Sequence, residues 1–205
     1  MVKVKICGIT NKEDIEFLEK FSVNYLGFIM YPPSPRFVGD RLGELLGFVK
    51  KALKVAVLVN PTFEEVKKVL DLGVDLIQLH GNETPDFGKR IGFERIIKAF
   101  RVRDKINFQE LEAWKEAKAL LLDTYLEGVF GGTGKAFNWE LAREAVRKGF
   151  KIFLAGGLKP ENILEAIEIV KPYGIDLSSG VEEYPGKKDH RKIEELFERL
   201  SKLKD

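Results

Sequence analysis

The chain has 205 residues, of which 44% are hydrophobic and 32% are charged, a composition typical of a globular protein with a charged surface. Its 34 basic and 32 acidic side chains leave a formal net charge of +2, so bulk charge favours neither a nucleic-acid nor a membrane partner. One cysteine and two histidines exclude an intrachain disulfide and are too few for a cysteine- and histidine-rich zinc site, so we expect no bound metal.

Eight short runs rich in Val, Ile and Leu follow one another along the chain and predict strands. Several are almost continuously apolar, as expected of parallel strands that are covered on both faces. The runs span residues 2–7, 24–30, 54–59, 75–80, 94–100, 118–124, 151–157 and 174–180.

Amphipathic stretches lie between these runs and predict helices. Asn11 and Thr62 are good helix N-caps, and Gly73 and Gly149 stand where helices end. The stretch 84–92 has the weakest helical pattern, because two glycines interrupt it. The predicted helices span residues 11–21, 61–73, 84–92, 138–149, 159–170 and 190–203.

This alternation predicts a single domain over residues 1–205, an α/β protein folded as a (β/α)₈ TIM barrel with eight parallel strands and outer helices. The alternative is a doubly wound open sheet, which has fewer strands and usually a glycine-rich fingerprint after the first one. Residues 7–14 read CGITNKED and contain no such fingerprint, so the barrel is favoured.

No apolar run approaches the roughly 18 residues of a membrane-spanning helix, and the first residues lack the pattern of a secretory signal. A cytoplasmic location is therefore expected. The abundance of Lys and Glu also points to a thermophilic source.

The catalytic groups of such a barrel gather where strands end and the following loops begin. Cys7 ends the first run, where it is either a small buried hydrophobe or a reactive thiol. A thiolate would be available near neutral pH if neighbouring cations or dipoles lower its pKa. Asp123 closes an apolar run, where a carboxyl is costly unless it is hydrogen-bonded or used. It either caps the adjoining loop or, with a pKa raised by partial burial, donates a proton.

Two glycine-containing loops are typical of phosphate binding. Residues 155–158 read AGGL ahead of a predicted helix, and residues 178–180 read SSG at the end of the eighth run. Glycines let backbone amides approach an anion, and a helix N-terminus adds a favourable dipole. Because barrels often bind phosphate after strands seven and eight, the sequence predicts a phosphate site formed by both loops.

Other polar residues are weaker candidates. Arg36, in a proline-stiffened loop, could hold a carboxylate with two parallel hydrogen bonds or could simply be exposed. His80 and Gln78 share one face of the fourth strand and either line the pocket or satisfy core hydrogen bonds. Asn60 and Asp176 are supporting candidates at strand ends.

The segment 125–139 is glycine-rich and long for so short a barrel. Long loops of this kind are usually lids or binding loops. Gly134 and Lys135 lie within it, and the lysine could reach an anion or remain a solvated loop residue.

Motifs at nearly every strand–loop junction resemble, in order and over the whole chain, those of the phosphoribosylanthranilate isomerase family of tryptophan biosynthesis. The motifs are KICGIT (5–10), GFIMYPPSPR (27–36), LVN (58–60), IQLHG (77–81), LLDT (121–124), GGTGKAFNW (131–139), AGGLKPENI (155–163) and DLSSGVEEYPGKKD (176–189).

The resemblance implies a cofactor-free isomerase with a small phosphosugar substrate. Its reaction would be the Amadori rearrangement of N-(5-phosphoribosyl)anthranilate to 1-(2-carboxyphenylamino)-1-deoxyribulose 5-phosphate. It makes Cys7 the general base, Asp123 the general acid and Arg36 the ligand of the substrate carboxylate. The oligomeric state, monomer or homodimer, stays open. The phosphate-binding amides implied are those of Gly156, Gly157, Ser179 and Gly180.

Three rival functions are weaker. A histidine-pathway isomerase would show paired aspartates at opposite strand ends, and the first strand here ends in cysteine. An indole-glycerol-phosphate synthase would place a lysine that acts as general acid at a strand end, whereas Lys5 lies two residues inside the strand. A binding module with an inactive barrel would not need both Cys7 and Asp123.

Overall fold

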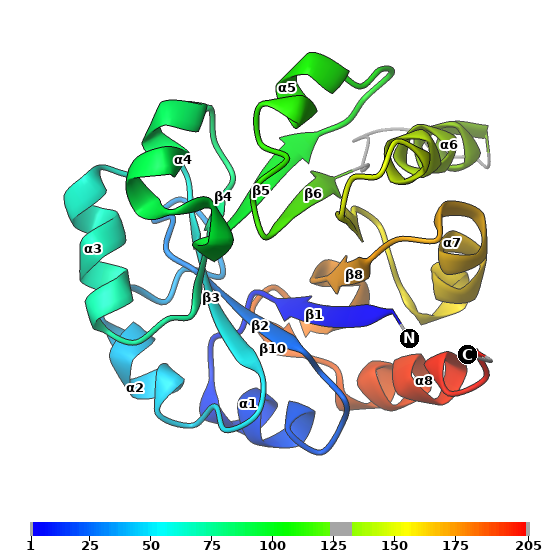
Figure 1. The fold of residues 1–205 in the computed structure, drawn as a ribbon. Coiled ribbons are helices and arrows are strands. Elements are labelled where there is room, and N and C mark those ends of the chain that lie inside the picture. The colour runs from blue at the N-terminus through cyan, green and yellow to red at the C-terminus, as the bar shows by residue number, and fades with distance from the viewer. Residues whose placement is uncertain (1, 124–132, 204–205) are drawn as a thin grey trace.

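The computed structural model describes residues 2–123 and 133–203, with only the backbone described over 133–138. Eight parallel strands form a closed barrel in chain order (Figure 1). They are β1 (Lys3–Cys7), β2 (Tyr25–Ile29), β3 (Leu53–Leu58), β4 (Leu76–Leu79), β5 (Ile96–Arg101), β6 (Ala119–Asp123), β7 (Ile152–Ala155) and β8 (Gly174–Leu177).

The last strand closes the barrel by pairing with the first. Strand β8 pairs in parallel with β7 and with β1, where Lys5 is in register with Asp176. An open sheet would leave β1 or β8 with a free edge, so this pairing rules out the doubly wound alternative and confirms the predicted barrel.

The helices form an outer ring around the strands (Figure 1). The predicted caps are present, since Asn11 accepts from the Asp14 amide and Thr62 forms a capping box with Glu65. The weakly predicted helix at 84–92 is also present, beginning after the N-cap Thr84. The helices are α1 (Lys12–Leu18), α2 (Leu42–Leu46), α3 (Phe63–Asp71), α4 (Pro85–Ile91), α5 (Phe108–Glu112), α6 (Thr133–Arg147), α7 (Ile163–Val170) and α8 (His190–Leu200). None in the described part of the chain is long and apolar enough to cross a membrane.

Two features of the helical ring differ from the sequence-based expectation. The helices α2 and α5 were not predicted, because five residues are too few to show a helical period. Helix α6 begins at Thr133 rather than at Asn138, so part of the predicted loop 125–139 is helical. Glycine costs a helix only about 1 kcal/mol relative to alanine, and Gly134 does not prevent this start.

The side chains of the strands alternate between two apolar layers. Outward residues such as Ile6 and Leu122 pack against the helices, and inward residues such as Tyr25, Leu121 and Phe153 fill the barrel. This period of two follows from strand geometry. It also directs the last inward residue of each strand toward the mouth of the barrel.

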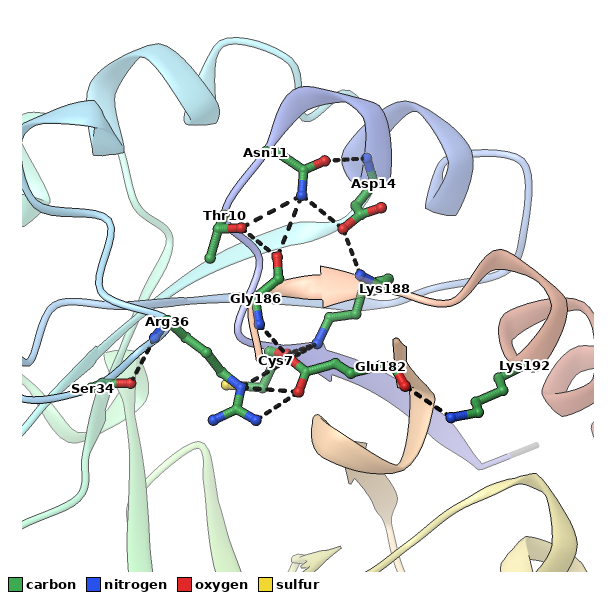
Figure 2. Close-up of polar contacts among 10 residues, drawn as sticks. All are labelled: Cys7, Thr10, Asn11, Asp14, Ser34, Arg36, Glu182, Gly186, Lys188 and Lys192. Atoms are coloured by element: carbon green, nitrogen blue, oxygen red, sulfur yellow. Dashed lines mark hydrogen bonds and ion pairs between the residues drawn. The ribbon is translucent and has the colours of Figure 1, made fainter. Parts of the chain in front are cut away.

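A small hairpin follows β8 and lies against the end of β1 (Figure 2). It consists of β9 (Glu182–Tyr184) and β10 (Lys187–Lys188), joined through Gly186 at φ +91°. The Thr10 hydroxyl and the Asn11 side-chain amide donate to the carbonyl of Gly186. The hairpin is therefore fixed beside the loop that follows Cys7.

Candidate active site

A cavity of about 330 Å³ opens at the carboxyl ends of the strands. Most of the predicted site residues line it, because each stands at the end of a strand or in the loop just after it. Those that do are Cys7, His80, Asp123, Gly156, Gly157, Asp176, Ser179 and Gly180. The sequence therefore identified the strand ends that meet at one place.

Cys7 ends β1 with its thiol in the cavity and is 6% exposed. A glycine in the neighbouring strand leaves room for it, since a Cβ on Gly27 would lie 2.6 Å from the Cys7 sulfur. The chain then turns at Gly8, which has φ +78°, a conformation that glycine adopts without strain. The two glycines thus fix the position of the thiol.

An ion pair inside the barrel lies directly below the thiol. The Lys5 ammonium is fully buried, lies 2.9 Å from an Asp176 carboxylate oxygen and is close enough for its charge to act on the Cys7 thiol. Burial raises the pKa of the Cys7 thiol, and the Lys5 charge only partly opposes it. The pKa of the thiol is therefore raised above its ordinary value, whereas a thiolate abundant at neutral pH requires a lowered one.

Asp123 ends β6 and lines the cavity together with Cys7. In the closed barrel, β6 is separated from β1 by β7 and β8. The acid and the thiol therefore enter the cavity from different sides of its wall. Both point inward, because Leu122 and Ile6 beside them in sequence pack outward.

The two glycine-containing loops lie in contact at one side of the cavity. Gly156 and Gly157 have φ values of +93° and +66°, which residues with a Cβ rarely adopt. A Cβ on Gly180 would lie 1.8 Å from the carbonyl oxygen of Leu158. Only glycine permits so close an approach of the two backbones.

Arg36 extends from the loop after β2 to the edge of this site. Its guanidinium binds Glu182 through two parallel hydrogen bonds, Nε to Oε1 at 2.9 Å and Nη2 to Oε2 at 2.6 Å (Figure 2). The predicted two-bond geometry is present, but a carboxylate of the protein occupies it. Arg36 is not among the described residues that line the cavity.

His80 and Gln78 line the wall of the cavity opposite the two glycine-containing loops. They contact each other, with Gln78 Nε2 lying 2.9 Å from His80 Nδ1. Burial lowers the pKa of His80 to about 4, and the nearby Lys5 charge acts in the same direction. The imidazole is therefore neutral at pH 7. The Oε1 atom of Gln78 is buried and has no hydrogen-bond partner among the described residues.

Asn60, which was expected to support the pocket, is not among the described residues that line the cavity. It has a left-handed φ of +47°, and its side chain accepts from the Asn82 amide at 2.7 Å. Its own amide donates to Glu83, whose carboxylate also binds the buried Lys98. Asn60 therefore joins the loops after β3 and β4.

The remaining predicted residues lie in or next to the segment 124–132, which falls outside the described residues. The greater part of the loop predicted over 125–139 falls outside the described residues. Gly134 and Lys135 belong to the first turn of α6, and their side chains are not among those described. Within the described ranges, no group of three His, Cys, Asp or Glu residues is placed to hold a metal ion.

Comparison with known proteins agrees with this geometry. The model of the family described as N-(5'-phosphoribosyl)anthranilate (PRA) isomerase matches residues 4–199. The chain belongs to this isomerase family. It is 50% identical over 202 residues to the N-(5'-phosphoribosyl)anthranilate isomerase of Aquifex aeolicus, a match covering 97% of this chain and 98% of the relative.

Solved structures of phosphoribosyl anthranilate isomerases have the same fold. The Thermotoga maritima enzyme superposes with a TM-score of 0.86 at 35% identity, over 99% of this chain and all of that one. A complex with reduced 1-(o-carboxyphenylamino)-1-deoxyribulose 5-phosphate gives a TM-score of 0.84 at 33% identity, with the same coverage. The resemblance inferred from the motifs is confirmed, and the chain is an isomerase of tryptophan biosynthesis.

Several groups at the site were missed at the level of sequence. Lys5 shares the inward face of β1 with Cys7, so the period of two could have identified it. Glu182 and Lys188 occur in the quoted motif 176–189 without an assigned role. Their positions beside Arg36 and Cys7 depend on the hairpin. The sequence around Pro185 and Gly186 consists largely of charged residues and fits a surface loop as well as it fits a hairpin.

Proposed function

We propose that this isomerase catalyses the Amadori rearrangement of N-(5-phosphoribosyl)anthranilate, with Cys7 as general base and Asp123 as general acid. The observation that carries the proposal is that a thiol and a carboxyl, on β1 and β6, line one cavity together with the two glycine-containing loops after β7 and β8. Such a cavity holds a phosphosugar by its phosphate between two proton-transfer groups.

The first step opens the ribose ring. Asp123 donates a proton to the ring oxygen while the bond from C1′ to that oxygen breaks. The lone pair of the anthranilate nitrogen forms a double bond to C1′, which gives an iminium cation. Asp123 is left as a carboxylate, so charge is conserved.

The second step moves a proton from carbon. The iminium cation acidifies the C2′ proton, and the Cys7 thiolate removes it. The electron pair of that C–H bond forms a C1′=C2′ double bond, and the cationic nitrogen becomes neutral. The resulting enolamine then loses its C2′ hydroxyl proton and gains one at C1′ to become the ketone, so the product is an isomer of the substrate.

The thiolate is the reactive form in this scheme, and burial makes it the minor form at neutral pH. The Lys5 ammonium beside the sulfur stabilises the negative charge that a thiolate carries. Rate should therefore increase with pH until the thiol is ionised. Correctly placed proton-transfer groups contribute about 10²–10⁴-fold each.

The substrate is held at its two anionic ends. The amides of Gly156, Gly157, Ser179 and Gly180 would bind the phosphate, and Arg36 the anthranilate carboxylate. Left-handed glycines and close backbone contact between the two loops support the first assignment. The second is supported by the position of Arg36, whose side chain passes over Gly8, the residue that follows Cys7.

The experiment is a turnover assay. Freshly generated phosphoribosylanthranilate loses its fluorescence as it rearranges, and purified protein should accelerate this decay. A decay equal to the uncatalysed rate would contradict the proposal.

A further inference from the structure

A buried carboxylate lies beside Arg36 and accepts hydrogen bonds from three groups, of which Arg36 is one (Figure 2). The Glu182 side chain is 3% exposed. It accepts from Arg36 Nε and Nη2, from Lys188 Nζ at 2.9 Å and from the Gly186 amide at 3.2 Å. Both of its oxygens are engaged by donors, so the carboxylate is held in one orientation.

This pairing determines how Arg36 faces the site. Nε and Nη2 are directed to Glu182, whereas Nη1 makes no hydrogen bond to any residue that the structure describes and points away from Glu182 (Figure 2). A Cβ on Gly8 would lie 2.5 Å from Arg36 Cδ and 3.0 Å from the hydroxyl of Ser178. Ser178 lines the cavity, so the arginine crosses Gly8 at the edge of the cavity.

Lys188 balances the charge of this carboxylate. Its side chain is fully buried, and its ammonium bonds both Glu182 and, at 2.6 Å, the backbone carbonyl of Cys7. Although burial raises the pKa of Glu182, Arg36 and Lys188 hold it below its ordinary value, so the carboxylate is ionised. Burial lowers the pKa of Lys188, and the charge of Glu182 opposes this. With Lys188 protonated, one negative and two positive side chains leave a net charge of +1 at the edge of the cavity.

We propose that Glu182 is a positioning residue that fixes Arg36 for a carboxylate on the substrate, and that Lys188 preserves the positive charge which attracts it. This inference rests on the proposed function, because it takes Arg36 to bind the anthranilate carboxylate. A guanidinium held by two of its nitrogens presents its remaining donors in a fixed plane, which planar carboxylates match. The bond from Lys188 to Cys7 also fixes the spacing between this carboxylate-binding group and the thiol.

The test is a double-mutant cycle between Glu182→Gln and Arg36→Ala. KM and kcat are measured for phosphoribosylanthranilate and for N-(5-phosphoribosyl)aniline, which lacks the carboxylate. With Arg36 present, E182Q should raise KM for the natural substrate roughly tenfold, as expected from one charge-assisted hydrogen bond. In the R36A background E182Q should change KM by less than about twofold, because Glu182 acts through Arg36 and that side chain is already absent.

The analogue without a carboxylate supplies the second readout. Its KM should be unaffected by E182Q, because the variant alters only the carboxylate-binding group. Since E182Q leaves the Lys188 charge buried without its partner, the cycle is repeated with Glu182→Gln combined with Lys188→Met, which removes both charges. Thermal unfolding confirms that each variant is folded.

The outcomes are distinguishable. Equal effects of E182Q with and without Arg36, or an equal effect on both substrates, would overturn the inference and leave the proposed function intact. Absence of turnover by the wild-type chain would overturn both. An R36A variant with an unchanged KM would remove the carboxylate-binding role of Arg36, and the inference with it.

Discussion

Replacing Gly180 by alanine should separate the two loops that we propose to bind phosphate. The new Cβ would lie 1.8 Å from the carbonyl oxygen of Leu158, whereas ordinary contact begins at 3.4 Å. The two backbones must therefore move apart by 1.6 Å, which is 3.4 minus 1.8. Binding groups must be held within about 0.5 Å of their working geometry, so amides on both loops cannot reach one phosphate together.

The loss can be estimated from single hydrogen bonds. One hydrogen bond to a charged group is worth about 1.5–3 kcal/mol, or roughly tenfold to a hundredfold in binding. The assay is competitive inhibition of turnover by ribose 5-phosphate, whose inhibition constant should rise by at least the lower factor in G180A. Ribose, which lacks the phosphate, should inhibit both proteins equally.

A matched control is Gly43→Ala in helix α2, where the Cβ would meet only Leu72 Cδ2 at 3.5 Å. This variant should retain the wild-type inhibition constant. A folded G180A protein that binds ribose 5-phosphate as well as the wild type would refute the assignment of phosphate to these loops.

Two further predictions concern titration. Lys5→Met removes the cation that opposes the raised pKa of the Cys7 thiol, so the rise of kcat/KM with pH should move to higher pH. The profile is also measured for K5M combined with Asp176→Asn, which keeps the barrel interior neutral. A profile that moves in neither variant would exclude Lys5 from the reaction. The pKa of His80 is lowered from 6.5 to about 4, which corresponds to about 3 kcal/mol of folding free energy. That contribution is present above pH 6.5 and is lost as pH falls through 4. The free energy of unfolding measured with urea should therefore fall by this amount more in the wild type than in His80→Gln over the same pH range. Equal pH dependence of the two free energies would contradict the prediction.

The sequence predicted what depends on local order along the chain. The sequence predicted that Cys7 and Asp123 lie at one cavity, because a parallel barrel brings every strand end to one face and the position of a residue in its own strand is then sufficient. The loops at 155–158 and 178–180 were found for the same reason. Asn60 lies two residues after the end of β3, and its left-handed backbone turns it toward the neighbouring loop, which a residue type does not reveal.

What the sequence could not predict depends on contacts between distant segments. Arg36 and Glu182 are 146 residues apart, and the sequence around either residue gives no sign that the two pair. The raised pKa of Cys7 depends on burial outweighing the Lys5 charge, a balance set by packing. The start of α6 was missed because glycines in a helix resemble those of a loop.

The central claim is that Cys7 and Asp123 act on one pentose from different sides of the cavity. Its most direct test is the fluorescence decay of phosphoribosylanthranilate with wild-type protein, Cys7→Ser and Asp123→Asn, each shown to be folded and to bind ribose 5-phosphate. We expect the wild type to be active and each variant to be slower by about 10²–10⁴-fold. Full activity in either folded variant would contradict the account.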